Sequence, residues 1–196
     1  MIEKETKLPH LYIIAGCNGA GKTTASFTIL PEVLNVTEFV NADEIAKGLS
    51  PFQPEKVSIE AGRIMIQRIN ELLNQKADFA LETTLASRRY IHIIQKAKSL
   101  DYKVHLVFLW LNDVHLAIER VKHRVLKGGH AIPIHIIKRR YHSGLSNFIH
   151  IYINKVDFWH LIDNTSQVPI LIAEKLKIGN IIIYNFDTWA NIQESV

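Results

Sequence analysis

A glycine-rich stretch near the start of the chain has the residue types and spacing of a phosphate-binding loop (P-loop). Residues 16–23 read GCNGAGKT and match the pattern G-x-x-x-x-G-K-[ST] at every fixed position. Glycines let successive backbone N–H groups turn toward one point, where they can bind an anion. Lys22 would reach the β- and γ-phosphates of a nucleoside triphosphate, and the Thr23 hydroxyl would bind Mg²⁺.

The residues on either side of this loop support the same interpretation. The apolar run over residues 11–15 predicts a buried strand, and residues 23–30 predict the start of a helix, whose N-terminus adds partial positive charge. The alternative interpretation is a glycine turn that arose by chance. From the P-loop pattern and the elements on either side of it, we predict that ATP and Mg²⁺ are the cofactors. The predicted nucleotide-binding residues are Gly16, Asn18, Gly19, Ala20, Gly21, Lys22, Thr23 and Thr24.

A carboxylate follows the second predicted strand, over residues 36–40. Asp43 lies just beyond this strand, and the ends of parallel strands meet at one edge of a sheet. Transfer of a phosphoryl group to a hydroxyl needs a carboxylate that orients the attacking oxygen and accepts its proton. Asp43 is the candidate base. The competing interpretation is an N-cap for a helix over residues 44–48.

A second carboxylate, Glu82, ends the strand predicted over residues 78–82 and is followed by two threonines. Glu82, Thr83 and Thr84 would suit a polar acceptor with several hydroxyl groups. Glu82 could instead hold Mg²⁺ through water, or it could cap a helix that begins near Ser87.

Arginines gather in the second half of the chain. Arg120 and Arg124 are four residues apart and share one helix face, and Arg140 follows a glycine pair at 128–129. Arginines commonly neutralise the charge that develops during phosphoryl transfer. The segment over about residues 124–142 predicts a lid, with a solvated basic face as the alternative.

Strands and helices alternate along the whole chain, which predicts a mostly parallel sheet with helices on both faces in a single domain over residues 1–196. The predicted strands cover residues 8–15, 36–40, 78–82, 103–111, 159–162, 168–173 and 181–184. The predicted helices cover residues 23–30, 55–75, 87–100, 113–126 with Asp113 as N-cap, 133 to past 140, and 187 onward.

Composition narrows the class of protein. The 196 residues are 47% hydrophobic and 21% charged, a balance typical of globular domains, and no apolar run is long enough to span a bilayer. Residues 1–5 do not read as a secretory signal, and the single cysteine, Cys17, excludes an internal disulfide, so we expect a cytoplasmic protein. Cys17 itself is either an oxidation switch or a small filler residue.

The remaining sequence patterns give little evidence for a nucleic-acid-binding, GTPase or metal-binding function. A formal charge of +4 and a basic block over residues 120–140 favour ligand phosphate over nucleic acid, because no nucleic-acid-binding motif accompanies them. Residues 154–157 read NKVD, the pattern that reads guanine in GTPases, but the chain lacks the accompanying D-x-x-G. The histidines lack metal-ligand spacing, and residues 104–111 lack a Walker B aspartate.

Together, these motifs resemble those of the zeta toxin family, in its short bacterial form, over most of the chain. The resemblance rests on the P-loop and on residues 39–46 (FVNADEIA), 80–85 (ALETTL), 117–121 (AIERV), 128–130 (GGH), 139–141 (RRY) and 163–164 (DN). It implies a P-loop kinase fold of three layers, α/β/α, with a helical lid. It also implies an ATP-dependent kinase that phosphorylates the sugar 3′-hydroxyl of UDP-N-acetylglucosamine, and a small helical antitoxin as a possible partner.

The resemblance also implies roles for individual residues. Asp43 matches the family's catalytic aspartate, and Glu82 and Thr84 match positions that contact the acceptor. Arg120 matches the first phosphate-facing arginine. The second corresponds to Arg124, Arg139 or Arg140, and the glutamate that short members often carry after residues 131–133 is replaced here by Ile134.

The sequence therefore predicts a P-loop kinase with a nucleotide sugar as acceptor, and with neither nucleic acid nor membrane as a partner. Two alternatives stay open. One is a kinase of another small metabolite or nucleotide, which a panel of acceptors would identify. The other is a nucleotide-binding interaction module, which would bind ATP without turnover that depends on an acceptor.

Overall fold

The structure is a computed structural model that describes residues 8–32, 34–177 and 179–196, so the prediction for residues 1–5 lies outside it. The strands are β1 (His10–Gly16), β2 (Glu38–Val40), β3 (Phe79–Thr83), β4 (Lys103–Trp110), β5 (Phe158–Asp163), β6 (Ile170–Lys177) and β7 (Asn180–Ile183). The α-helices are α1 (Lys22–Glu32), α2 (Ala42–Leu49), α3 (Ser58–Asn74), α4 (Tyr90–Ser99), α5 (Val114–Leu126), α6 (Ile134–His150) and α7 (Phe186–Glu194). The short 3₁₀ helices are η1 (Pro54–Val57) and η2 (Tyr152–Asn154).

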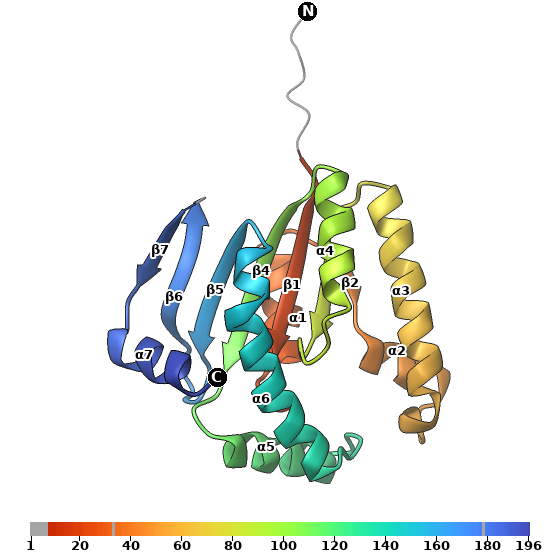
Figure 1. The fold of residues 1–196 in the computed structure, drawn as a ribbon. Helices are drawn as coiled ribbons and strands as arrows, with labels where there is room; N and C mark the ends of the chain where they lie inside the picture. Colours follow the sequence, from red (N-terminus) through yellow and green to blue (C-terminus); the bar gives the residue numbers. More distant parts are fainter. Residues whose placement is uncertain (1–7, 33, 178) are drawn as a thin grey trace, which may run out of the picture.

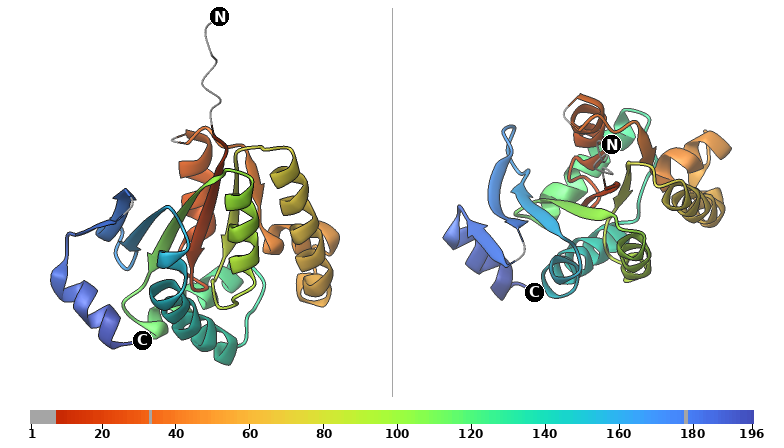
Figure 2. Two further views of the ribbon diagram at one scale, coloured as in Figure 1. Left: turned by 45° about the horizontal axis from the view of Figure 1, so that its top comes forward. Right: turned by 90° about the horizontal axis from the view of Figure 1, so that it is seen from above.

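The strands form one sheet in the order β2-β3-β1-β4-β5-β6-β7. The first five strands in this order are parallel, and β6 and β7 are antiparallel additions at one edge. Helices α3, α4 and α6 lie on the near face in Figure 1, and α1 lies on the far face; the view from above in Figure 2 separates the two layers. The mostly parallel α/β sheet between helical layers is confirmed.

Several element boundaries differ from the prediction. The helix predicted over residues 55–75 is divided into η1 and α3, because Pro54 and the residues after it form a 3₁₀ turn first. Helix α4 begins at Tyr90, three residues later than predicted. Helix α2 was considered only as an alternative role for residues 44–48, and it is a full helix of eight residues.

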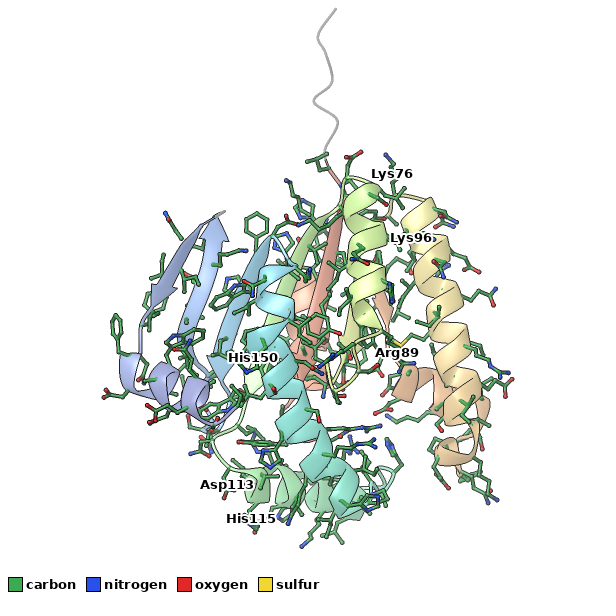
Figure 3. All side chains as sticks on the ribbon, viewed as in Figure 1. Lys76, Arg89, Lys96, Asp113, His115 and His150 are labelled. Carbon is green, nitrogen blue, oxygen red and sulfur yellow. The ribbon has the colours of Figure 1, made fainter. Side chains whose placement is uncertain are left out.

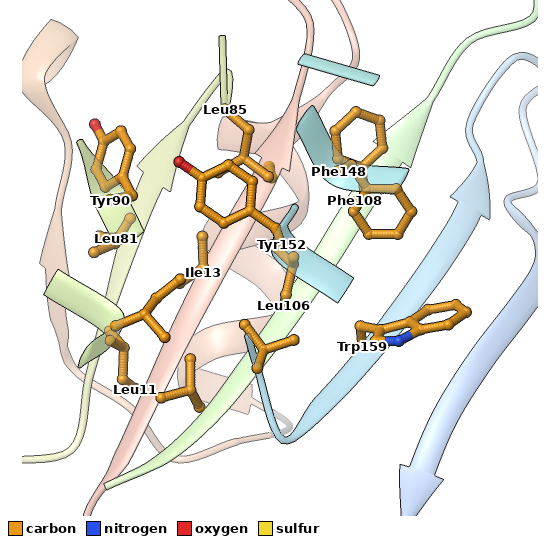
Figure 4. Close-up of a cluster of buried hydrophobic side chains, with 14 of the residues drawn as sticks. Leu11, Ile13, Leu81, Leu85, Tyr90, Leu106, Phe108, Phe148, Tyr152 and Trp159 are labelled. Carbon is orange, nitrogen blue, oxygen red and sulfur yellow. The ribbon is translucent and has the colours of Figure 1, made fainter. Parts of the chain in front are cut away.

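The core lies between the near face of the sheet and the helices that cover it. Leu11, Ile13, Leu81 and Leu106 point from the strands into this layer and are fully buried (Figure 4). Buried apolar side chains are expected on parallel strands that are covered by helices. At the far side of the layer, Trp159 stacks on Trp189 of α7 with ring centroids 5.9 Å apart, which attaches the C-terminal helix to β5.

Helix α6 holds the loop that leaves β3. A Cβ atom at Gly144 would collide with the backbone carbonyl of Thr84, so only glycine allows α6 to approach this closely. The Asn147 Nδ2 donates to the Leu85 carbonyl at 2.8 Å, and the Tyr152 hydroxyl donates to the Ser87 carbonyl at 2.6 Å. These contacts hold the end of β3 and the residues after it in place.

The carboxyl ends of the parallel strands point to the lower edge of the sheet in Figure 1, where α2, α5 and the start of α6 also lie. Asp113 and His115 mark the start of α5 at this edge (Figure 3). The Asp113 side chain accepts from the His115 N–H at 2.8 Å, so the predicted N-cap is confirmed. Within the described residues, no helix has the length and apolar character to cross a membrane.

The far face of the sheet carries a stack of rings that makes stability depend on pH. The His105 ring lies 4.7 Å from Tyr12 and 4.6 Å from Phe158, and burial lowers the pKa of His105 to about 4. Between a pH of about 6.5 and about 4, an unfolded chain takes up this proton and the folded chain does not. The free energy of unfolding should therefore fall as the pH falls through this range.

Urea unfolding at about pH 7 and about pH 5 measures this effect. The wild type should lose more stability between the two values than His105→Gln, which has no proton to gain. Equal losses in the two proteins would show that other groups account for the pH dependence.

Candidate active site

The P-loop joins β1 to α1, as predicted. Gly19 and Gly21 have φ angles of +83° and +85°, which only glycine adopts readily, and they lie on either side of Ala20. The buried Lys22 ammonium donates to the Cys17 carbonyl at 2.9 Å, across the loop. The lysine is therefore held over the concave side of the loop, where phosphates would bind.

Cys17 is a residue of the P-loop, and its side chain is buried. Burial raises the pKa of the Cys17 thiol to about 11, so the thiol stays protonated near neutral pH. Because the thiolate is the reactive form, this environment favours the filler role over the oxidation switch.

Glu82 contacts the residues predicted to bind phosphate and metal. Its carboxylate accepts from the Thr23 hydroxyl at 2.9 Å and from the Asn41 Nδ2 at 2.9 Å, and it lies 3.6 Å from the Lys22 ammonium. Helix α4 begins at residue 90 with no side-chain cap, so the capping role considered for Glu82 is wrong.

Asp43 lies in the first turn of α2. The N-cap of this helix is Asn41, whose side chain accepts from the Asp43 N–H at 2.8 Å, so the capping role considered for Asp43 is also wrong. The Asp43 side chain is 49% exposed and lines a cavity of about 510 Å³ together with Lys22 and Arg140. The P-loop lysine, the carboxylate and an arginine of α6 therefore line one space.

His130, at the turn after α5, approaches Asp43 from the other side, with its Nε2 3.9 Å from the Asp43 Oδ2. Burial lowers the pKa of His130, so the ring is neutral at neutral pH and this contact is not an ion pair.

The three arginines named as catalytic candidates occupy different positions. Arg140 donates to the Asn18 Oδ1 of the P-loop at 3.2 Å, and burial lowers its pKa from the usual high value. Arg124 contacts the His130 carbonyl at 3.4 Å and lines an adjoining cavity of about 650 Å³ that also contains Thr23 and Asp43.

Arg120 lines the same adjoining cavity, and its guanidinium is already paired. It donates to the carbonyl oxygens of Asn164 at 2.9 Å and Thr165 at 2.7 Å, in the loop after β5. This guanidinium therefore has a fixed plane beside the P-loop, and the loop that fixes it had no role in the sequence interpretation.

Further polar residues line the cavity of about 510 Å³. Thr84, a predicted acceptor-binding residue, is among them, and Arg139 lies there as well. Thr24 is exposed on α1 and lines neither cavity. The residues of this cavity that sequence reasoning left without a role are Asn41, Ala42, Ala86, Ser87, Arg89, Tyr90 and Ser143. All of these except Ser143 of α6 follow β2 or β3, and this position was the available signal, because residues that follow parallel strands gather at one edge.

The NKVD pattern lies at the other end of the sheet. Asp157 accepts from the Val104 N–H at 2.9 Å and pairs with Lys98 at 3.1 Å, at the amino end of β5. This position is remote from the P-loop edge and supports the interpretation of the pattern as a coincidence.

The sequence of this chain matches a known protein family. The sequence profile described as "Zeta toxin" matches residues 2–168. The chain belongs to the zeta toxin family. This zeta toxin family member is 34% identical over 127 residues to an uncharacterized protein of Haemophilus influenzae, a match that covers 64% of this chain and 88% of the relative.

Solved structures share the fold of this zeta toxin family member. A chain of the AvrRxo1-ORF1:AvrRxo1-ORF2 complex matches with a TM-score of 0.80 and 17% identity over 96% of this chain, which spans only 64% of that chain. A chain of the PezAT toxin–antitoxin system of Streptococcus pneumoniae matches with a TM-score of 0.63 and 13% identity, over 98% and 87% of the two chains. Shikimate kinase of Acinetobacter baumannii matches with a TM-score of 0.50 and 21% identity, over 83% and 86%. At these identities the likeness establishes the P-loop kinase fold alone.

Proposed function

We propose that this zeta toxin family member is an ATP-dependent kinase that transfers the γ-phosphoryl group to a sugar hydroxyl of UDP-N-acetylglucosamine. Family membership and the fold support the phosphotransferase part of this proposal. One observation carries the reaction: Lys22, Asp43 and Arg140 line a single cavity at the carboxyl edge of the sheet.

ATP would bind with its phosphates against the P-loop. The backbone N–H groups that lead into α1, the helix dipole and the Lys22 ammonium all favour negative charge at this point. The Lys22 ammonium donates to the Cys17 carbonyl and lies 3.6 Å from a Glu82 carboxylate oxygen. Both contacts hold the ammonium near the predicted phosphate position.

The donor set beside the P-loop fits Mg²⁺. The Thr23 hydroxyl and a Glu82 carboxylate oxygen lie 2.9 Å apart, and both are hard oxygen ligands of the type that Mg²⁺ prefers. Thr23 would bind the ion directly, and Glu82 would hold it through water. When bound, Mg²⁺ would neutralise charge on the phosphates.

Asp43 would act on the acceptor hydroxyl. Its carboxylate would accept the hydroxyl proton as the new oxygen–phosphorus bond forms and the bond between the β- and γ-phosphates of ATP breaks. Arg140, next to the P-loop, would stabilise the charge on the transferred group. We assign Arg120 and Arg124, which line the adjoining cavity, to the nucleotide phosphates.

The acceptor would occupy the cavity of about 510 Å³. Arg89, Arg139 and Arg140 line it together with Ser87 and Thr84, a combination that suits an acceptor with both anionic groups and hydroxyl groups. A nucleotide sugar has both. Residues 124–142 would close over this cavity as a lid, within a single kinase domain over residues 1–196.

A partner and a location follow from the same proposal. Two of the similar structures are chains of two-component complexes, one of them a toxin–antitoxin system, which supports a possible antitoxin for this chain. ATP as the phosphoryl donor favours the cytoplasm as the place of the reaction.

An acceptor panel tests the proposed function. ADP release from the wild type with Mg²⁺ and ATP should rise at least about tenfold when UDP-N-acetylglucosamine is added, and mass spectrometry should find a monophosphorylated product. UDP-glucose, shikimate and free nucleosides serve as the comparison. Stimulation by one of these instead would indicate another metabolite kinase, and ATP binding without any stimulation would indicate an interaction module.

A further inference from the structure

The loop after β5 contacts the P-loop through one side chain. The Asn164 Nδ2 donates to the Ala20 carbonyl at 2.7 Å. The contact is so close that a Cβ atom at Gly21 would stand 2.6 Å from the same nitrogen. Residues 163–164 belong to the motifs of the sequence analysis, and neither has a role in the proposed reaction.

Asn164 is held firmly by the residues around it. Its own N–H donates to the Trp110 carbonyl at 2.9 Å, which continues the pairing of β4 with β5 by one residue. The neighbouring Thr165 N–H donates to the Asp163 Oδ1 at 2.8 Å, and the Thr165 hydroxyl accepts from the Asn112 N–H at 3.0 Å. The side-chain donor of Asn164 is thus presented to the P-loop by a loop tied to two strand ends.

The same loop also fixes Arg120. The carbonyl oxygens of Asn164 and Thr165 accept the two hydrogen bonds from its guanidinium. In addition, a Cβ atom at Gly19 would stand 3.3 Å from the Arg120 Cβ, so Arg120 also packs against the P-loop. Asn164 therefore joins the P-loop and an arginine of the site into one unit.

The direction of the Ala20 carbonyl matters for phosphate binding. The Ala20 C=O and the Gly21 N–H belong to one trans peptide plane and point in opposite directions. When the carbonyl points to Asn164, the N–H points away from Asn164. Rotation of this peptide changes the ψ angle of Ala20 and the φ angle of Gly21. Gly21 has a φ angle of +85° and no Cβ atom to restrict it, so this peptide could rotate if the hydrogen bond were lost.

We propose that Asn164 is a positioning residue that holds the peptide between Ala20 and Gly21 in the orientation that binds the β- and γ-phosphates. The inference rests on the proposed nucleotide site and concerns nucleotide affinity rather than the choice of acceptor. Without the Asn164 donor, the Ala20 carbonyl loses its buried partner and can turn its partial negative charge toward the phosphates.

The test uses a fluorescent ATP analogue with Mg²⁺ and the full chain. Asn164→Ala removes the donor, and Asn164→Asp replaces it with an acceptor of nearly the same shape. The dissociation constant of the analogue should rise about tenfold in Asn164→Ala and more in Asn164→Asp. Displacement by AMP, which has no β- or γ-phosphate, should change less than about twofold relative to the wild type, because only the phosphate-binding peptide is altered.

Asn154→Asp is the matched control, because Asn154 is exposed, lies at the opposite end of the sheet, and receives the same substitution. Its affinity for the analogue should equal that of the wild type. Unchanged affinity in both Asn164 variants would overturn the inference. Equal losses for the analogue and AMP, or a large fall in the melting temperature of the unliganded variants, would also overturn it, because they indicate general loss of structure. Wild-type protein that does not bind the analogue would contradict the proposed function, and the inference would fall with it.

Discussion

Replacing Asp43 with asparagine is expected to lower kcat by about 10²–10⁴-fold while ATP affinity stays within about twofold of the wild type. Asparagine has nearly the same shape as aspartate but cannot accept the acceptor's proton. The fold should be retained, because Asn41 and not Asp43 caps α2, and because the Asp43 side chain is 49% exposed. The loss therefore reports chemistry and not folding.

The measurement is ADP release with saturating ATP and UDP-N-acetylglucosamine, together with a binding titration of an ATP analogue. Asp187→Asn is the matched control, because Asp187 is also exposed in the first turn of a helix that an asparagine caps, α7, and lines neither cavity. This control should keep nearly full activity. Undiminished turnover in Asp43→Asn would show that another group activates the acceptor.

Replacing Arg140 with glutamine is expected to lower kcat by about 10³-fold, the low end of the effect of an arginine that stabilises the transferred phosphoryl group. Arg140 of α6 contacts the P-loop through Asn18, and it shares a cavity with Lys22 and Asp43. Arg124→Gln should cost far less, because Arg124 contacts a backbone carbonyl at 3.4 Å in the adjoining cavity.

Arg140→Lys refines this comparison. Lysine keeps the charge but loses the planar pair of donors, so it should restore only part of the activity. Steady-state kinetics of the three variants with the same acceptor would decide the assignment. A larger loss in Arg124→Gln than in Arg140→Gln would assign the γ-phosphate to Arg124.

The order of elements and the edge that holds the site could be predicted from the sequence. The apolar strands, the glycine pattern and the N-cap at Asp113 depend on residues that are close together in the chain, so their signals are local. The rule that ligands bind at the carboxyl ends of parallel strands then placed the P-loop, Asp43 and Glu82 at one edge. The antiparallel pairing of β6 with β5 and of β7 with β6 was not predicted, because an apolar run does not indicate the direction of its pairing.

The partners of the site residues could not be predicted. The sequence placed Glu82 at the end of a predicted strand, at the edge of the sheet that holds the P-loop. Capping of a helix and metal binding were both compatible with this position. The structure shows contacts with Thr23 and Asn41, 59 and 41 residues away in the chain. Likewise, capping by Asn41 and not by Asp43 depends on where the chain enters α2, a difference of two residues that composition does not resolve.

The sequence by itself determined the P-loop, the alternation of strands and helices, and the presence of carboxylates and arginines at the nucleotide edge, because backbone preference and hydrophobic period are properties of short segments. Only the tertiary structure decided which of these residues contact one another. The bond from Asn164 to Ala20 joins residues 144 positions apart, and the bond from Arg140 to Asn18 joins residues 122 apart. Such contacts depend on strand order, register and helix packing, which are set by the whole core and not by any one segment.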